Sequence, residues 1–398
     1  MKFLMTILLV SGTALAEMSP LPPPAVEEDT TPYQIVIEEV ALPSQATQPV
    51  MTRESDPVVE DPDAETVEER AIRLPNCSHA LLPPKGYSTE VLMLQIFLDR
   101  HNFSAGVIDG VWGTTSRTAM AAWQTSEGVA PTTWIDLPLY ARIAEMVEPL
   151  ERYAIVSNDV ALVTGATPPT WAERSRLRVM GYDTLGECIA ERFHTSERTL
   201  RYLNPAIINW PEDLTVGTSL VVPNVRMAAL EHPARLVIAL DECLLVGYDT
   251  NGVIRLRFPC SIARNKRNLP QVGEVTIKNM AIAPNYTYDP ANYGQDESIG
   301  KMVVPAGPRN PVGSRWIGLS LPGYGIHGTP HPNTIGRPES RGCFRLTNWN
   351  VEKLFALVHS GMRVDIIQKL ADVHSPANLI DLKEAKEVQD KQSIEGIK

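Results

Sequence analysis

The chain has 398 residues, with 36 basic and 47 acidic side chains and a formal net charge of −11. This length suits two or three domains. The apolar share of 43% and the charged share of 21% are globular values that exclude a mostly disordered chain and a multispan membrane protein. The net charge argues against a nucleic-acid-binding face spread over the whole protein.

The first 16 residues are typical of a cleavable signal peptide. Lys2 supplies a positive start, Phe3 to Val10 form an apolar run, and Ala14 and Ala16 make an A-x-A cleavage site. The apolar run is shorter than the roughly 20 residues of a membrane-spanning helix. We therefore expect an exported protein with no stable membrane span after cleavage.

Residues 17–75 hold 14 acidic and only 3 basic side chains, together with a run of three prolines. No sustained apolar period is present, so this segment cannot bury enough surface to offset its ordering entropy. We expect an extended, acidic, Pro-rich linker that carries most of the net charge. The tail over residues 373–398 is polar and is expected to be peripheral.

An exported chain meets an oxidising environment, and its five cysteines are an odd number. The turn Asp249–Gly252 predicts a β-hairpin between Cys243 and Cys260. If Tyr248 faces Val253, the two cysteines lie one diagonal step apart, which leaves open either a disulfide or two buried thiols. A second candidate pair, without local support, is Cys77 with Cys188.

Residues 85–150 predict a small all-α domain. Apolar side chains between Thr89 and Leu98 and again between Ala119 and Trp123 indicate two helices. A glycine-rich turn, Gly106–Gly113, separates them, and Thr114 to Ser116 are suitable N-caps for the second helix. The segment resembles the peptidoglycan-binding repeat domain, whose pattern is met by Leu94, Gln95, Gly106, Asp109, Gly110, Gly113, Thr115, Ala119 and Gln124.

Residues 176–225 predict a second compact unit with α+β structure. A helix follows Tyr182, a second one near Leu200 ends at Asn204, and Val216–Pro223 is expected to be a strand. No clear strand precedes Gly181. The pattern Y-D-T-L, helix, helix, L-N-P and a closing strand resembles a LysM glycan-binding module.

Residues 234–368 predict a mostly β domain. Short strands are expected at residues 236–240, 244–248, 254–258 and 363–367. The single expected helix has Val351, Leu354, Phe355 and Val358 on one face, with Thr347 or Asn348 as its cap.

Cys343 and His327 are the candidate catalytic pair of this domain. A thiol needs a base to become a nucleophile, and an imidazole 16 residues away can supply one. Gly342 leaves backbone N–H groups free to approach an oxyanion. Arg341 and Arg345 are expected to lower the pKa of the thiol and to hold a substrate carboxylate.

Two other interpretations of these residues stay open. Cys343, His327 and His331 could bind a metal, although neither a CxxC nor a second nearby thiol supports such a site. Arg345 could be a plain surface charge.

The string from His327 to Leu346, the capped helix and the closing strand resemble the YkuD-type L,D-transpeptidase catalytic domain. The resemblance implies that Cys343 is the nucleophile, that His327 is its base, and that the Gly328 carbonyl orients the imidazole. Gly342 and Cys343 would supply the oxyanion hole. The substrate-binding residues would be Arg345, Ser340 and Arg341.

This sequence also departs from the family pattern. Leu269–Gly273 differs from the usual Thr-Pro-x-Gly, and residues 278–310 are longer than the family minimum, so we expect a different lid over the cleft. His331 has no assigned role.

The resemblance implies a periplasmic or cell-wall enzyme that transfers a tetrapeptide stem of peptidoglycan to an amine, with no cofactor and no metal. Its partners would be stem peptides, glycan and an anchored envelope protein as a further acceptor, but not nucleic acid. The alternatives are an L,D-carboxypeptidase or crosslink hydrolase that uses water, and an inactive peptidoglycan-binding scaffold.

Overall fold

The computed structural model describes residues 86–374, apart from residues 133, 146–147, 227–230, 294–295, 297 and 299. These described residues belong to one compact unit. The predicted signal peptide, the acidic linker, Cys77 and the tail from residue 375 onward lie outside them.

Three helices form the first part of this unit: α2 (Thr89–Arg100), α3 (Thr114–Ser126) and α4 (Leu137–Ala144). Both predicted helices are present, whereas α4 was not predicted. Gln95 holds the glycine-rich turn, because its Oε1 accepts hydrogen bonds from the backbone N–H groups of Asp109 and Gly110 at 2.9 and 2.8 Å. Gly110 has a φ of +68°, and a Cβ there would lie 2.6 Å from the Tyr87 ring, so the turn requires glycine.

A smaller α+β part follows. Its elements are β1 (Leu150–Ala154), α5 (Ser157–Ala161), α6 (Trp171–Arg174), α7 (Leu185–Arg192), α8 (Glu197–Leu203) and β2 (Ser219–Pro223). The predicted strand and both predicted helices are present. The strand that pairs with β2, however, is β1, which lies well before the expected boundary at residue 176. Residues 155–184, which include α5 and α6, therefore form an insertion between β1 and α7.

The prediction of a mostly β domain over residues 234–368 is confirmed. Eight strands form one sheet in the order β11-β10-β9-β6-β12-β3-β4-β5. They are β3 (Arg235–Ala239), β4 (Leu244–Tyr248), β5 (Ile254–Pro259), β6 (Gly273–Ile282), β9 (Arg315–Leu319), β10 (Gly325–His327), β11 (Phe344–Arg345) and β12 (Arg363–Ile367). A separate two-stranded pair consists of β7 (Tyr286–Tyr288) and β8 (Met302–Val304).

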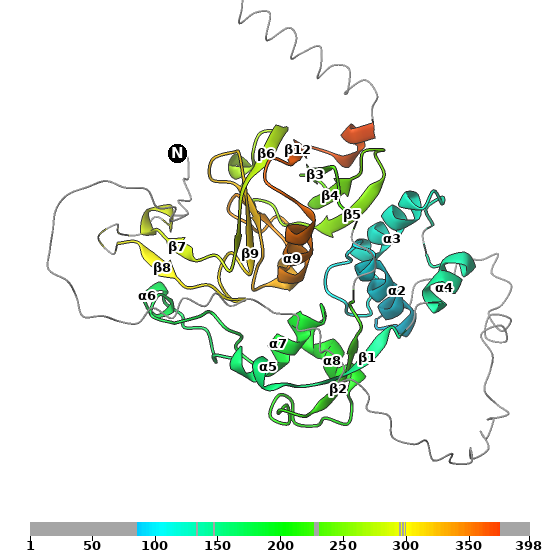
Figure 1. The fold of residues 1–398 in the computed structure, drawn as a ribbon, viewed down its shortest axis with the longest axis horizontal. Helices are drawn as coiled ribbons and strands as arrows, with labels where there is room; N and C mark the ends of the chain where they lie inside the picture. The colour runs from blue at the N-terminus through cyan, green and yellow to red at the C-terminus, as the bar shows by residue number, and fades with distance from the viewer. Residues whose placement is uncertain are drawn as a thin grey trace, which may run out of the picture. The chain divides into compact units, whose positions relative to one another are not determined.

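Helix α9 (Asn348–Leu357) begins at the predicted cap, since the Thr347 hydroxyl accepts a hydrogen bond from the Asn350 N–H. Its Val351 and Leu354 are fully buried in the main apolar cluster of the sheet. Figure 1 shows α9 lying against β9. The short 3-10 turns are η1 (Lys266–Asn268), η2 (Pro290–Tyr293), η4 (Pro332–Thr334) and η5 (Leu370–His374).

The expected register of the β4–β5 hairpin was wrong. Tyr248 pairs with Ile254 because of a bulge beside Gly247, and the Cys260 N–H donates to the Cys243 carbonyl at 2.8 Å. The two cysteines therefore lie side by side, yet both thiols are free and buried. The buried-thiol alternative is the correct one, and the Cys188 thiol is free as well.

A buried ionic cluster joins the three parts. The Lys353 ammonium on α9 donates to the Asp99 carboxylate on α2 at 2.8 Å, and His194 Nδ1 lies 2.9 Å from the same oxygen. Asp99 is 1% exposed and Lys353 is 5% exposed. His194 also stacks on Trp349 with ring centroids 5.3 Å apart. Helix α2, the turn after α7 and helix α9 are thus fixed to one another by charge and packing.

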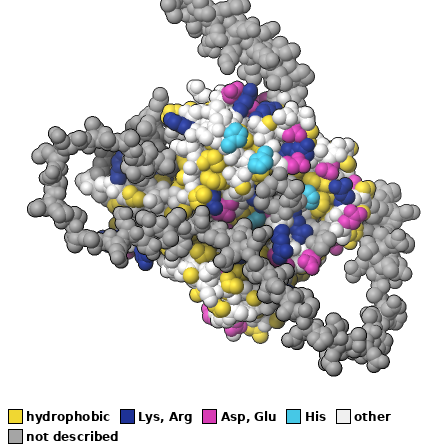
Figure 2. All heavy atoms as spheres, in the orientation of Figure 1, with side chains coloured by type: hydrophobic (Ala, Val, Ile, Leu, Met, Phe, Trp, Pro, Cys, Tyr) yellow, Lys and Arg dark blue, Asp and Glu magenta, His cyan; other side chains and the backbone are white. Residues whose placement is uncertain are grey.

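Figure 2 shows basic and acidic side chains interspersed on the visible face rather than gathered into a patch of one sign. Within the part of the chain that the structure describes, no helix is long and apolar enough to cross a bilayer.

Candidate active site

Strand register brings the predicted catalytic residues to one face of the sheet. Strand β10 pairs in parallel with the edge strand β11, with Ile326 opposite Phe344 and His327 opposite Arg345. Side chains alternate along a strand and paired residues share a face. Cys343, directly before β11, therefore lies on the same face as Arg345 and His327.

His327 is held in one tautomer. Its Nδ1 lies 2.6 Å from the Gly328 carbonyl oxygen. Since a carbonyl can only accept, Nδ1 carries the proton and Nε2 keeps its lone pair. The ring stacks on Trp316 of β9, with centroids 5.6 Å apart and planes at 21°. Burial lowers the pKa of His327 to about 4; the Gly328 carbonyl opposes this shift and Arg345 adds to it.

Gly328 has no room for a side chain. A Cβ at this position would lie 2.1 Å from Asn348 Oδ1, which already accepts the Ser314 N–H at 3.1 Å. Gly313 is confined by the same oxygen at 2.2 Å and has a φ of +64°. Close packing of these glycines on the first residue of α9 thus fixes the carbonyl that faces His327.

Cys343 is 6% exposed, and its thiol donates to the Gly323 carbonyl at 3.5 Å. Burial raises the pKa of Cys343 to about 11. The expectation that Arg341 and Arg345 lower this pKa was therefore wrong, because desolvation of the thiolate dominates. Both shifts favour a neutral thiol and a neutral imidazole at neutral pH.

Ser340, three residues before the nucleophile, is hydrogen-bonded to the backbone that follows β5. Ser340 is 7% exposed, its N–H donates to the Ile262 carbonyl at 2.8 Å, and its carbonyl accepts the Arg264 N–H at 2.9 Å. The Ser340 hydroxyl accepts the Gly342 N–H at 3.3 Å, so this N–H is engaged locally rather than directed at an oxyanion. Arg341 lines an open hollow together with Arg264, Asn265, Asn268, Glu339 and Ser340.

Arg345 is half-buried, which does not fit a plain surface charge. Its backbone pairs with Ser261 in both directions, at 2.9 and 2.8 Å. Its side-chain Nε is buried and has no hydrogen-bond partner among the described residues. Burial lowers the pKa of this guanidinium. A buried donor without an acceptor is a position where an anionic or carbonyl group of a ligand would be stabilised.

His331 is exposed at the start of η4, and its carbonyl accepts the Thr334 hydroxyl at 2.7 Å. Between residues 86 and 374, as far as they are described, no group of three or more His, Cys, Asp and Glu side chains is placed to hold a metal.

Sequence reasoning missed three parts of the site. Trp316, which stacks on the imidazole, gave no signal beyond being an aromatic residue in an apolar run. Gly325 allows this contact, because a Cβ there would lie 2.4 Å from the Trp316 ring. The Gly323 carbonyl that accepts the thiol belongs to the turn before β10.

Known proteins share this domain. The family YkuD, described as the L,D-transpeptidase catalytic domain, matches residues 233–366. The putative L,D-transpeptidase YkuD of Bacillus subtilis is 30% identical over 184 residues, which cover 46% of this chain and 93% of that protein. Its namesake in Bacillus licheniformis is 29% identical over 180 residues, covering 45% of this chain and 92% of that protein.

Among solved structures, an L,D-transpeptidase from Xylanimonas cellulosilytica is 15% identical and covers 73% of this chain and 99% of that one, with a TM-score of 0.29. Given the near-complete coverage of the Bacillus subtilis protein at 30% identity, the chain belongs to the YkuD family of L,D-transpeptidases.

Proposed function

We propose that this enzyme forms a thioester between Cys343 and a peptidoglycan tetrapeptide stem and passes the acyl group to an amine. The sulfur attacks the carbonyl of the third residue of the stem, while its proton moves to His327 Nε2. The C–N bond to the terminal D-Ala then breaks, and the proton leaves with the D-Ala amine. An acceptor amine attacks the thioester, gives its proton to His327, and the thiol is restored.

The observation that carries this proposal is the tautomer of His327. The Gly328 carbonyl at 2.6 Å keeps the proton on Nδ1, so the free Nε2 is available as a base. Burial also keeps both the thiol and the imidazole neutral at rest. The nucleophile is therefore generated during attack by general-base catalysis, rather than held in advance as a thiolate–imidazolium pair.

The polar groups around Cys343 support an anionic peptide as substrate. Arg345 offers a buried Nε without a partner among the described residues, and Arg341 and Arg264 line the adjacent hollow. Stem peptides carry free carboxylates, and arginine is well suited to hold them. We propose that Arg345 contacts the stem, with Ser340 holding the loop that carries Arg341. Rotation of Ser340 would free the Gly342 N–H for the oxyanion.

We further propose export to the periplasm or cell wall, and binding of the wall by residues 85–150 and by the LysM-like part. The peptidoglycan-binding and LysM resemblances of these segments support this, and so does the buried cluster that fixes both to the catalytic domain. An envelope protein with an exposed amine would be a second type of acceptor.

The test is muropeptide analysis of isolated sacculi treated with the enzyme, with and without an added amine acceptor. We expect acceptor-dependent new products and release of D-Ala, both abolished in Cys343→Ala. Release of D-Ala with no acceptor product would show an L,D-carboxypeptidase, and loss of existing crosslinks a hydrolase. Unchanged sacculi would show a binding scaffold.

A further inference from the structure

The apolar cluster that contains the nucleophile also includes residues from outside the catalytic domain, among them the buried Met180. Cys343 belongs to an apolar cluster with Tyr288 and Val304 of the β7–β8 pair and with Trp316 beside the imidazole. Packed against the same cluster is Trp171, the first residue of α6. The family match begins only at residue 233, so Trp171 comes from the insertion between β1 and α7.

Trp171 makes ring contacts that join this insertion to the β7–β8 pair. Its indole stacks on Tyr288 with centroids 4.5 Å apart and planes at 16°, and it meets Tyr286 at 5.7 Å. The Arg174 guanidinium covers the indole at 4.8 Å from its centroid. Helix α6 begins with a capping box between Thr170 and Glu173, which fixes the position of the tryptophan.

Polar contacts anchor the insertion just beside this aromatic contact. The Met180 N–H donates to the Ala306 carbonyl at 2.8 Å, and the Met180 carbonyl accepts the Arg309 N–H at 3.0 Å. Gly307 allows this approach, because a Cβ there would lie 2.3 Å from the Met180 carbonyl oxygen. The Arg309 guanidinium pairs with Asp183 at 3.0 Å.

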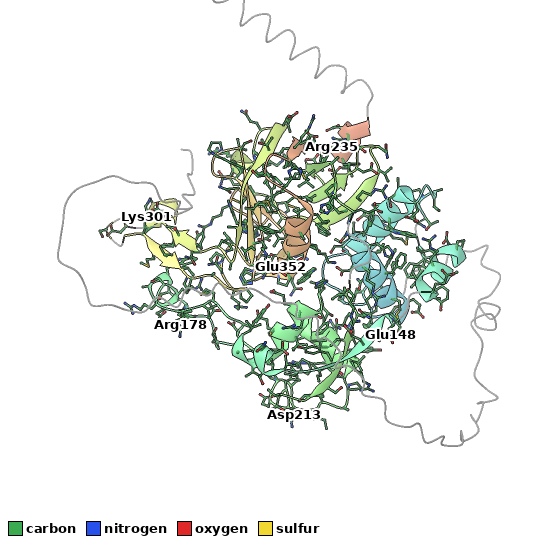
Figure 3. All side chains as sticks on the ribbon, viewed as in Figure 1. Glu148, Arg178, Asp213, Arg235, Lys301 and Glu352 are labelled. Atoms are coloured by element: carbon green, nitrogen blue, oxygen red, sulfur yellow. The ribbon has the colours of Figure 1, made fainter. Side chains whose placement is uncertain are left out.

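Figure 1 shows α6 beside β8, in agreement with their packing. In Figure 3 the labels Lys301, just before β8, and Arg178, just beyond α6, mark the two segments that meet here. The insertion thus contacts this part of the catalytic domain at three separate points, Trp171, Met180 and Asp183.

We propose that Trp171 is a positioning residue for the family's reaction: it holds the β7–β8 pair over Cys343, so that the insertion completes the substrate pocket. Without the indole, Tyr286 and Tyr288 lose their ring contacts with the insertion, and the pair swings away from the nucleophile. The pocket wall then no longer shields or orients a donor stem. The role in substrate binding rests on the proposed function, whereas the role in covering the thiol does not.

The first arm of the test measures thiol alkylation by iodoacetamide in the full chain, read for each cysteine by mass spectrometry. In Trp171→Ala the Cys343 rate should rise about tenfold, the equivalent of losing one aromatic pair. The buried thiols of Cys188, Cys243 and Cys260 report general loosening and should not change. Trp171→Phe, which keeps a ring, should stay within about twofold of wild type.

Trp112→Ala is the matched control, since it removes another aromatic partner, the one that packs edge-on to Trp134 at 4.5 Å in the helical part. It should leave the Cys343 rate unchanged. An unchanged rate in Trp171→Ala, or an equal rise at all four buried thiols, would overturn the proposal. In the second case Trp171 would support the whole fold rather than the β7–β8 pair.

The second arm measures acyl transfer from a synthetic tetrapeptide donor. Trp171→Ala should raise KM about tenfold and change kcat by no more than about threefold, because the catalytic pair itself is intact. A fall in kcat of about tenfold with an unchanged KM would contradict a positioning role. If the wild-type enzyme transfers no acyl group, the proposed function fails, and the alkylation arm still decides the role of Trp171.

Discussion

Replacing Asp99 with Asn removes the negative charge from the buried cluster that joins α2 to α9. Lys353, 5% exposed, would then keep a buried ammonium that is no longer neutralised by a carboxylate, with only neutral acceptors such as the position-99 backbone carbonyl, now at 2.8 Å. Removing one partner of a buried ion pair typically destabilises a protein by about 3–5 kcal/mol. We expect a loss of free energy of unfolding in this range for Asp99→Asn.

A double-mutant cycle makes the expectation specific. Lys353→Met removes the ammonium, so the amide introduced in the double variant Asp99→Asn/Lys353→Met faces no unpaired charge and keeps a partner in His194. The double variant should therefore be more stable than Asp99→Asn alone, by about 2 kcal/mol or more. The assay is denaturant unfolding followed by both near-UV and far-UV circular dichroism.

The change of the free energy of unfolding with pH gives a second test of the ion pair. The charges of Lys353 and His194 hold the pKa of Asp99 below its usual range despite burial. The wild-type stabilisation is therefore present above about pH 4, the ordinary pKa of Asp, and is lost as pH falls below it. In Asp99→Asn this loss between about pH 4 and lower pH should be absent, because no carboxyl group remains at position 99 to be protonated. Additive single-variant losses, with no pH dependence, would refute this reasoning.

Three further predictions concern the site and its support. Glu191→Gln should stabilise the protein by about 1–3 kcal/mol at pH 8. Burial raises the pKa of Glu191 to about 7, and the favourable protonated form is lost as pH rises through that value. Thermal unfolding at pH 5 and 8 measures this, and a lower stability of the variant at pH 8 would contradict it. Gly328→Ala should lower kcat about 100-fold or more, because its Cβ would displace Asn348 and the carbonyl that orients His327; a near wild-type kcat would show that this carbonyl is dispensable. The alkylation rate of Cys343 should rise steadily as pH rises toward about 11, and kcat/KM should fall as pH drops through about 4, where His327 gains its proton. An alkylation rate that stays constant between these two pH values would indicate a thiolate–imidazolium pair instead.

The sequence predicted the site better than its surroundings, for local reasons. Cys343 and His327 stand in a short motif, although the short strands β10 and β11 at these positions were not predicted. The contact between the Gly328 carbonyl and the imidazole was implied by the family resemblance, and the distance of 2.6 Å agrees with it. The raised pKa of the thiol could not be predicted from the sequence, since it depends on burial by residues from distant segments. The expected effect of the nearby arginines neglected this desolvation.

The longest strand was also missed. β6 (Gly273–Ile282) mixes polar and apolar residues without clean alternation, and most of its side chains are only half-buried or exposed. Its place in the sheet depends on pairing with β12 and β9, which are far away in sequence. The partner of β2 was missed because the insertion of residues 155–184 separates β1 from the helices that follow it.

The central claim is that Cys343 carries the acyl group of the donor. The most direct measurement is the mass of the enzyme quenched during turnover of a tetrapeptide donor, followed by peptide mapping. The account predicts an adduct equal to the donor minus D-Ala, located on Cys343, removed by an added amine and absent in Cys343→Ala. An adduct on another residue, or wild-type turnover by Cys343→Ala, would contradict it.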